Sequence, residues 1–157
     1  MVGLTPLAPA FARILLAPKI ALAVGPRAVS AEFISPRGAI LSSWRVSDTG
    51  DTVELNATVP VGVVGTITVP KPFEPTTGNP TATAVVIESG VRVWDGHALI
   101  GTTAGIVSAQ NTPGGVAFEV LSGAYEFRSG NPGTQLVAGD PPRHGKDHGE
   151  TVLYKSP

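Results

Sequence analysis

The segment Val93 to His97 brings together three side chains whose chemistry suits sugar recognition. Trp94 offers an aromatic face for the C–H surface of a sugar, while Asp95 and His97 offer a carboxylate and an imidazole for its hydroxyl groups. Asn111 is a further polar candidate in a later turn-rich stretch. These four residues predict a carbohydrate-binding site, formed by loops and needing no cofactor. The alternative is an ordinary Asp-Gly turn that follows a half-buried tryptophan.

Hydrolytic chemistry is not indicated by the acidic residues. Glu88, Glu119 and Glu126 fall with Asp95 on separate predicted strands, and no spacing among them selects an acid and base pair. Ser122 lacks the flanking pattern of a nucleophile elbow. We therefore expect no catalytic residue, and exposed strand charge accounts for these carboxylates.

The C-terminal stretch HGKDHGE contains side chains of the kinds that bind divalent metals. They are His144, Asp147, His148 and Glu150. Glycines break this stretch, so a metal would itself have to order any site built there. The prediction is a polar tail over residues 129–157 without a preformed metal site, and whether it binds a metal is left open.

Composition favours an all-β chain. The 157 residues include 19 glycines and 15 prolines with only 15% charged residues, which is typical of a chain cut often by turns. A formal net charge of −1 provides no basic surface for nucleic acid or anionic lipid. The sequence has no cysteine, which excludes disulfides and thiolate metal sites. We expect uncharged partners, and neither nucleic-acid binding nor membrane insertion.

The apolar N-terminus does not read as a signal peptide. It has no basic leading region, and Pro6, Pro9, Arg13 and Pro18 interrupt the apolar run. We predict an N-terminal segment of mature chain at residues 1–9. The protein is expected to be cytoplasmic, or exported without a signal peptide.

Period-two alternation is clearest over two consecutive segments, 39–46 and 52–59. The residues predicted to face inward are Ile40, Ser42, Trp44, Val46, Val53, Leu55, Ala57 and Val59. The intervening Ser-Asp-Thr-Gly-Asp supplies turn chemistry, so these segments predict an antiparallel hairpin. Trp44 on this pattern is a core residue rather than a sugar platform.

Further short strands are predicted on both sides of this hairpin. The run Ala12 to Ile20 suggests a first strand at a sheet edge, and strands follow at 64–69, 83–90, 91–96 and 114–127. Alternation stops after Arg128. Seven or eight strands with frequent turns predict a two-sheet antiparallel β-sandwich over residues 10–128.

Four motifs in order carry a family resemblance. They are SPRGAILSSWRV, VELNATVPVGVVGTITVP, VIESG and VLSGAYEF. This succession resembles the C-terminal β-sandwich domain of α-L-rhamnosidases of glycoside hydrolase family 78. Those enzymes hydrolyse through acidic residues on a helical barrel, which this sequence is too short and too poor in helical periodicity to build, so the resemblance carries over no catalytic residue.

The resemblance and the Trp94 loop together leave two hypotheses. In the first, the chain is a non-catalytic carbohydrate-binding protein, a lectin, which binds glycans or simple sugars and forms a homo-oligomer. In the second, it is a structural or protein-interaction module, or an accessory fragment of a glycoside hydrolase, without a sugar site.

Overall fold

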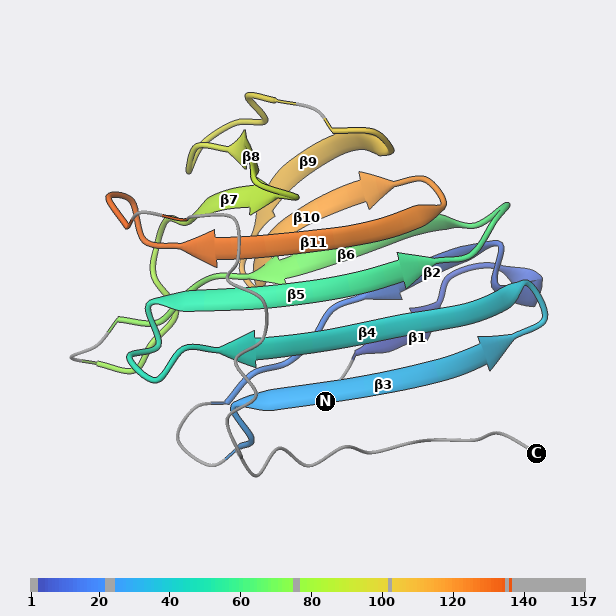
Figure 1. Ribbon diagram of the computed structural model, residues 1–157, viewed down its shortest axis with the longest axis horizontal. Helices are drawn as coiled ribbons and strands as arrows, with labels where there is room; N and C mark the ends of the chain where they lie inside the picture. The colour runs from blue at the N-terminus through green and yellow to red at the C-terminus, as the bar shows by residue number, and fades with distance from the viewer. Residues whose placement is uncertain (1–2, 22–24, 75–76, 102, 135, 137–157) are drawn as a thin grey trace.

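The computed structural model consists of two β-sheets that lie face to face (Figure 1). It describes residues 3–21, 25–74, 77–101, 103–134 and 136. One sheet has five strands in the order β1 (Leu4–Pro6), β2 (Arg13–Leu16), β6 (Val64–Pro70), β10 (Gly115–Val120) and β9 (Ile106–Thr112). The other has six, in the order β3 (Ala28–Ser35), β4 (Gly38–Val46), β5 (Thr52–Val59), β11 (Gly123–Gly130), β7 (Val85–Glu88) and β8 (Val91–Trp94). A short 3-10 turn, η1, spans Pro9–Phe11. The predicted all-β sandwich is confirmed.

The pairing is antiparallel except between β2 and β6. These two strands run parallel, with Arg13 opposite Val64 and Leu16 opposite Ile67. The prediction that the first apolar run forms an edge strand is wrong. The N-terminal strand β1 pairs antiparallel with β2, with Leu4 opposite Leu16, and takes the edge position itself.

The predicted hairpin is confirmed as β4 and β5. Trp44 lies opposite Leu55, and Ser42 lies opposite Ala57. Every residue predicted to face inward on these two strands is buried. Alternate residues on the same strands are partly or fully exposed, as expected for strands with one face on a core.

The core lies between the sheets and is closed by aromatic contact across them. Phe118 of β10 and Phe127 of β11 stack with their ring centroids 4.8 Å apart, and both side chains are buried. Tyr125 stacks on Phe127 at 6.0 Å within the six-stranded sheet. Offset aromatic pairs of this kind stabilise a fold beyond the area that they bury.

Three features lie outside the predicted elements. Strand β9 falls in a stretch for which no strand was predicted. Strand β1 lies within the predicted N-terminal segment 1–9, and β11 continues to Gly130, past the predicted boundary at residue 128. Among the helical segments that the structure describes, none is long and apolar enough to cross a membrane.

Candidate functional site

Trp94 is a core residue at the end of β8. It lies opposite Val86 of β7 and forms an isolated bridge with Leu99. Its side chain is 3% exposed and belongs to the same apolar cluster as Phe127. In this conformation the indole presents no open face to a ligand.

Asp95 stabilises the turn that follows Trp94. Its carboxylate accepts hydrogen bonds from the backbone N–H groups of His97, at 2.8 Å, and of Ala98, at 2.9 Å. The N–H donors of Ala98 and His97 hold the pKa of Asp95 below its usual value. Gly96, between Asp95 and His97, adopts a φ of +111°, a conformation that favours glycine. Asp95 therefore acts as the acceptor of an Asx-type turn.

The other predicted site residues are not brought to one place. His97 is exposed beside the Asp95 turn. Asn111 is also exposed but lies on β9 of the other sheet, opposite Val116. Within the described ranges, no hydrogen bond joins Asn111 to the loop at residues 94–97. The possible metal ligands from His144 to Glu150 lie outside the described residues.

Trp44 is buried on the inner side of β4, as predicted. Its side chain is 3% exposed, and its indole N–H has no hydrogen-bond partner among the described residues. It shares this condition with the buried hydroxyl of Ser42 two residues earlier on the same strand. The structure thus assigns Trp44 to packing.

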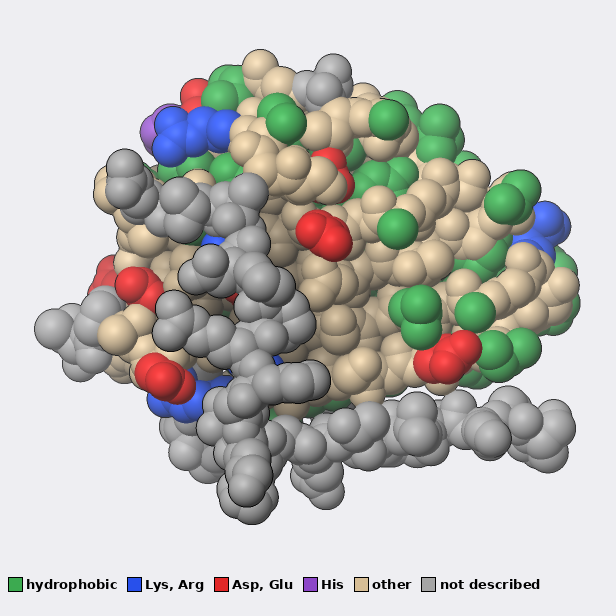
Figure 2. All heavy atoms as spheres, in the orientation of Figure 1, with side chains coloured by type: hydrophobic (Ala, Val, Ile, Leu, Met, Phe, Trp, Pro, Cys, Tyr) green, Lys and Arg blue, Asp and Glu red, His purple; other side chains and the backbone are tan. Residues whose placement is uncertain are grey.

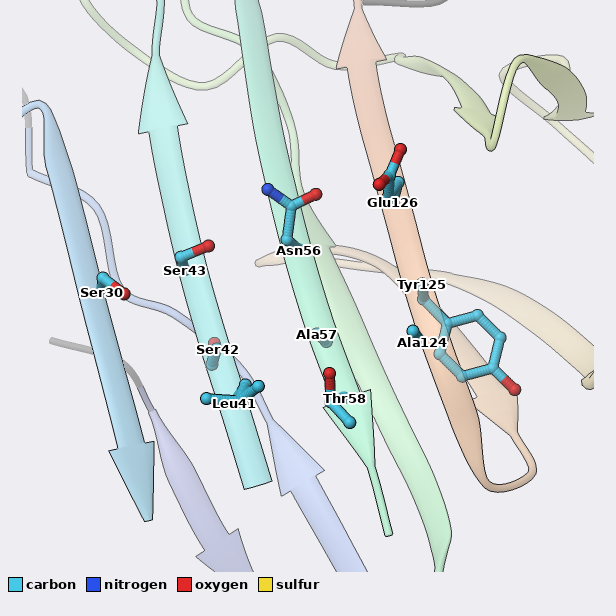
Figure 3. A pocket seen from close by; sticks show the side chains of 10 residues that line it. All are labelled: Ser30, Leu41, Ser42, Ser43, Asn56, Ala57, Thr58, Ala124, Tyr125 and Glu126. Atoms are coloured by element: carbon cyan, nitrogen blue, oxygen red, sulfur yellow. The ribbon is translucent and has the colours of Figure 1, made fainter. Parts of the chain in front are cut away.

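A different set of polar groups lies on the outer face of the six-stranded sheet. Ser30, Ser43, Asn56 and Glu126 come from four adjacent strands, β3, β4, β5 and β11, and stand directly opposite one another. Figure 3 shows their side chains side by side across the sheet. We call these four residues the polar row.

A shallow hollow of about 310 Å³ lies over the polar row. Its lining includes the next cross-strand set, Leu41, Thr58 and Ala124. In Figure 2, much of the visible part of this face is tan, the colour of the backbone and of side chains that are neither charged nor hydrophobic, with scattered acidic and hydrophobic side chains between. The hollow is therefore a polar surface with an apolar border, to which Leu41 contributes a side chain that is 42% exposed.

The polar row keeps its side-chain hydrogen-bonding groups unpaired within the described residues. In the part of the chain that the structure describes, none of the four makes a side-chain hydrogen bond. On the side of the polar row away from Leu41, by contrast, Glu54 of β5 forms an ion pair with Arg128 of β11. Neighbouring strands lie about 4.8 Å apart, so the row presents hydroxyl, amide and carboxylate groups at regular spacing on a rigid surface.

The arrangement suits binding rather than bond cleavage. Glu126 is the only carboxylate among the described residues that line the hollow. Glycoside hydrolysis ordinarily needs two carboxyl groups on either side of the scissile bond. Hydroxyl and amide groups, by contrast, are the usual partners of neutral polar ligands.

Sequence reasoning did not find the polar row, because its members are far apart in the chain. Each is one residue in the outward half of an ordinary strand pattern. Glu126 was noticed only as an isolated strand charge. These residues come together only through the register in which the strands pair, and that register cannot be read from a single sequence.

Fold and site together define a β-sandwich with a polar hollow on the outer face of its six-stranded sheet. The sequence profile of the bacterial alpha-L-rhamnosidase C-terminal domain family matches residues 3–83. The chain belongs to this family, as the resemblance indicated, and the matched range contains the first two of the four motifs, SPRGAILSSWRV and VELNATVPVGVVGTITVP. No curated protein matches the chain.

Two solved structures share the fold. An alpha-L-rhamnosidase from Dictyoglumus thermophilum superposes with a TM-score of 0.55 and 15% identity, over 83% of this chain and 12% of that one. The Streptomyces avermitilis alpha-L-rhamnosidase, complexed with L-rhamnose, gives a TM-score of 0.53 and 18% identity, over 81% of this chain and 10% of that one. This chain therefore spans about a tenth of the length of either enzyme.

Proposed function

We propose that this chain is a non-catalytic carbohydrate-binding β-sandwich whose sugar site is the polar row. The observation that carries the proposal is the set of hydroxyl, amide and carboxylate side chains that line the hollow of about 310 Å³ and have no hydrogen-bond partner among the described residues. Such groups bind the hydroxyls of a sugar by direct hydrogen bonds, without a cofactor. Membership of a family of rhamnosidase C-terminal domains supports a carbohydrate as the ligand.

The border of the hollow favours a deoxy sugar over a fully hydroxylated one. Leu41 and Ala124 place apolar groups beside Thr58, one cross-strand step from the polar row. A methyl group at one end of the ligand would contact this border, and the hydroxyls would reach Asn56 and Glu126. L-rhamnose, which is 6-deoxy-L-mannose, has this distribution, and it is the sugar bound in the Streptomyces avermitilis enzyme.

The proposed role includes no hydrolysis. Among the described residues that line the hollow, Glu126 is the only carboxylate. Hydrolysis would need two carboxyl groups, one to protonate the leaving group and one to act as base or nucleophile, and only one is present there. The chain would act beside a catalytic domain or protein by holding it on its substrate. A site of this openness is expected to bind a monosaccharide with a Kd of about 1 mM.

The test is a titration of ¹⁵N-labelled protein with L-rhamnose, followed by NMR. Amide shifts are expected on β4, β5 and β11, and L-mannose, which carries the extra hydroxyl, is expected to bind more weakly. Asn56→Ala should weaken L-rhamnose binding about tenfold, because the hydrogen bonds between the side-chain amide and the sugar hydroxyls are lost. Asn111→Ala makes the same change at an exposed position of the other sheet and should leave binding unchanged.

The same titration tests the loop that the sequence predicted. Shifts confined to residues 95–98, and lost in His97→Ala, would place the sugar at that loop and overturn the polar row. Loss of binding in Asn56→Ala with His97→Ala unaffected would support the sheet face.

A structural or protein-interaction module is the second candidate function. The burial of both Trp44 and Trp94 favours it, because neither indole is left as an aromatic platform for a sugar. The absence of any shift with L-rhamnose, L-mannose and other simple sugars would support this candidate over the first.

A further inference from the structure

Strand β9 leaves a long backbone edge open at one side of the five-stranded sheet (Figure 1). It pairs with β10 on one side, and no described strand pairs with the other. Its seven residues, Ile106–Thr112, include neither a charged residue nor a proline. An edge of this kind presents unpaired N–H and C=O groups that can accept another strand.

The other three edges carry features that oppose strand addition. At the far side of the same sheet, β1 has three residues and ends at Pro6. In the six-stranded sheet, β8 has four residues and carries the exposed Arg92. The longer β3 carries the exposed Glu32 near its middle. Short length, proline and charge are common means by which sheet edges avoid association, and β9 has none of these three. Its register shift lies at its first residues, between Ile106 and Ser108, and leaves the rest of the strand regular.

All seven side chains along β9 are uncharged, and four of them are exposed. Ser108, Gln110 and Asn111 are exposed, and Val107 is 54% exposed. At the start of β9, the exposed Leu121 donates its backbone N–H to the carbonyl of Gly105, which precedes the strand. An incoming strand would therefore meet no like charge and would cover apolar surface.

We propose that β9 pairs antiparallel with β9 of a second copy of this chain, which joins two five-stranded sheets into one continuous sheet. A twofold axis at Ala109 sets Ser108 opposite Gln110 of the other copy, in the regular part of β9 that follows the register shift between Ile106 and Ser108. The twofold axis brings the same strand of each copy together, as a closed dimer requires. Because β9 is uncharged, the two strands meet without repulsion between like charges. This inference does not rest on the proposed function, since β9 contributes nothing to the polar row.

The first measurement is the mass of the protein in solution by light scattering and sedimentation over a wide concentration range. A monomer–dimer equilibrium is expected. The variant Ser108→Lys/Gln110→Lys would set lysines opposite each other at the twofold axis, and it should shift the equilibrium to monomer by about tenfold or more in Kd. Circular dichroism should show the same β content as the unchanged protein.

A control variant places two lysines on the other long edge. Glu32→Lys/Ile34→Lys changes two exposed residues of β3 with the same spacing and should leave the dimer intact. A monomer at every concentration, or a dimer that survives the β9 lysines and is lost with the β3 lysines, would overturn the proposal.

The register has its own readout because the chain contains no cysteine. Ser108→Cys/Gln110→Cys should give a covalent dimer on mild oxidation, since opposed side chains on paired strands come within about 5 Å at Cβ. A dimer by light scattering that does not cross-link in this variant would refute the register centred on Ala109.

Discussion

The hydroxyl of Ser129 donates a hydrogen bond of 2.6 Å to the backbone carbonyl of Pro70 and so joins the two sheets. Ser129 lies on the inner side of β11, and Pro70 ends β6 of the opposite sheet. The serine is fully buried, so water does not compete for this bond. A polar link inside an apolar interface fixes how the sheets align, in addition to the stacking of Phe118 on Phe127.

Replacement of this serine is expected to destabilise the sandwich. Ser129→Ala removes the donor to Pro70 and should lower the free energy of unfolding by about 1–2 kcal/mol. Ser42→Ala is the matched control, because Ser42 is also buried but its hydroxyl has no partner among the described residues. That change should leave stability unchanged or slightly higher. Urea unfolding measures both, and equal losses would contradict the assigned role of the Ser129 hydrogen bond.

The turn between β4 and β5 should make stability depend on acid pH. The carboxylate of Asp51 accepts hydrogen bonds from the hydroxyls of Thr49, at 2.6 Å, Ser47, at 2.7 Å, and Thr52, at 3.0 Å. These donors, Thr49 foremost, hold the pKa of Asp51 below its usual value. A lowered pKa in the folded state stabilises the protein above the unfolded value of about 3.9, and the contribution is lost as pH falls through the folded value.

The variant Asp51→Asn is expected to be less stable than the unchanged protein at pH 7, by about 1 kcal/mol. The difference should shrink below about pH 4, where the carboxylate of the unchanged protein takes up its proton. Asp48→Asn alters an exposed carboxylate of the same turn, whose side chain makes no hydrogen bond within the described residues, and it should have little effect. Thermal unfolding at several pH values tests this, and a difference that stays constant from pH 7 to pH 3 would contradict it.

What the sequence predicted well was local. The hairpin of β4 and β5 follows from strict alternation and turn residues, so each inward residue, Trp44 included, is correct. Strand β9 escaped prediction because a register shift near Ile106 breaks its alternation, and its polar residues resemble a loop. The edge position of β2 was wrong because Leu4–Pro6, a three-residue segment that ends in proline, was not predicted as a strand, yet it pairs with β2 on the side away from β6.

The candidate site shows the same limit. Trp94, Asp95 and His97 are adjacent in sequence, and their chemistry alone suggested a sugar platform. Burial of the indole depends on the strands packed against it, which no local pattern reveals. The polar row has the opposite character, since its residues acquire a common surface only through the register of four strands.

Gly105 is expected to tolerate no side chain. A Cβ at this position would lie 2.2 Å from the hydroxyl oxygen of Tyr125, and its φ is +94°. That hydroxyl donates to the carbonyl of Leu121 at 2.8 Å, and burial, followed by the charge of Glu88, raises the pKa of Tyr125. The collision would displace a buried aromatic ring together with its hydrogen bond.

Gly105→Ala should therefore cost about 3 kcal/mol, from strain at positive φ and from the clash. Gly114→Ala is the control, since a Cβ there meets no atom within 4 Å and the backbone is not left-handed. It should change stability by less than about 0.5 kcal/mol. Chemical unfolding of the two variants decides the matter, and similar values for both would show that the Tyr125 contact is not tight.

Fluorescence distinguishes the packing role of the tryptophans from a role as a sugar platform. The chain has two tryptophans, so Trp44→Phe and Trp94→Phe each leave one emitter. Since both side chains are 3% exposed, each variant should emit at shorter wavelength than the chain unfolded in urea and should resist quenching by acrylamide. Added L-rhamnose should leave both spectra unchanged, because neither ring faces the polar row. Emission from Trp94 that is readily quenched by acrylamide and protected by a sugar would instead return the binding site to the loop at residues 94–97.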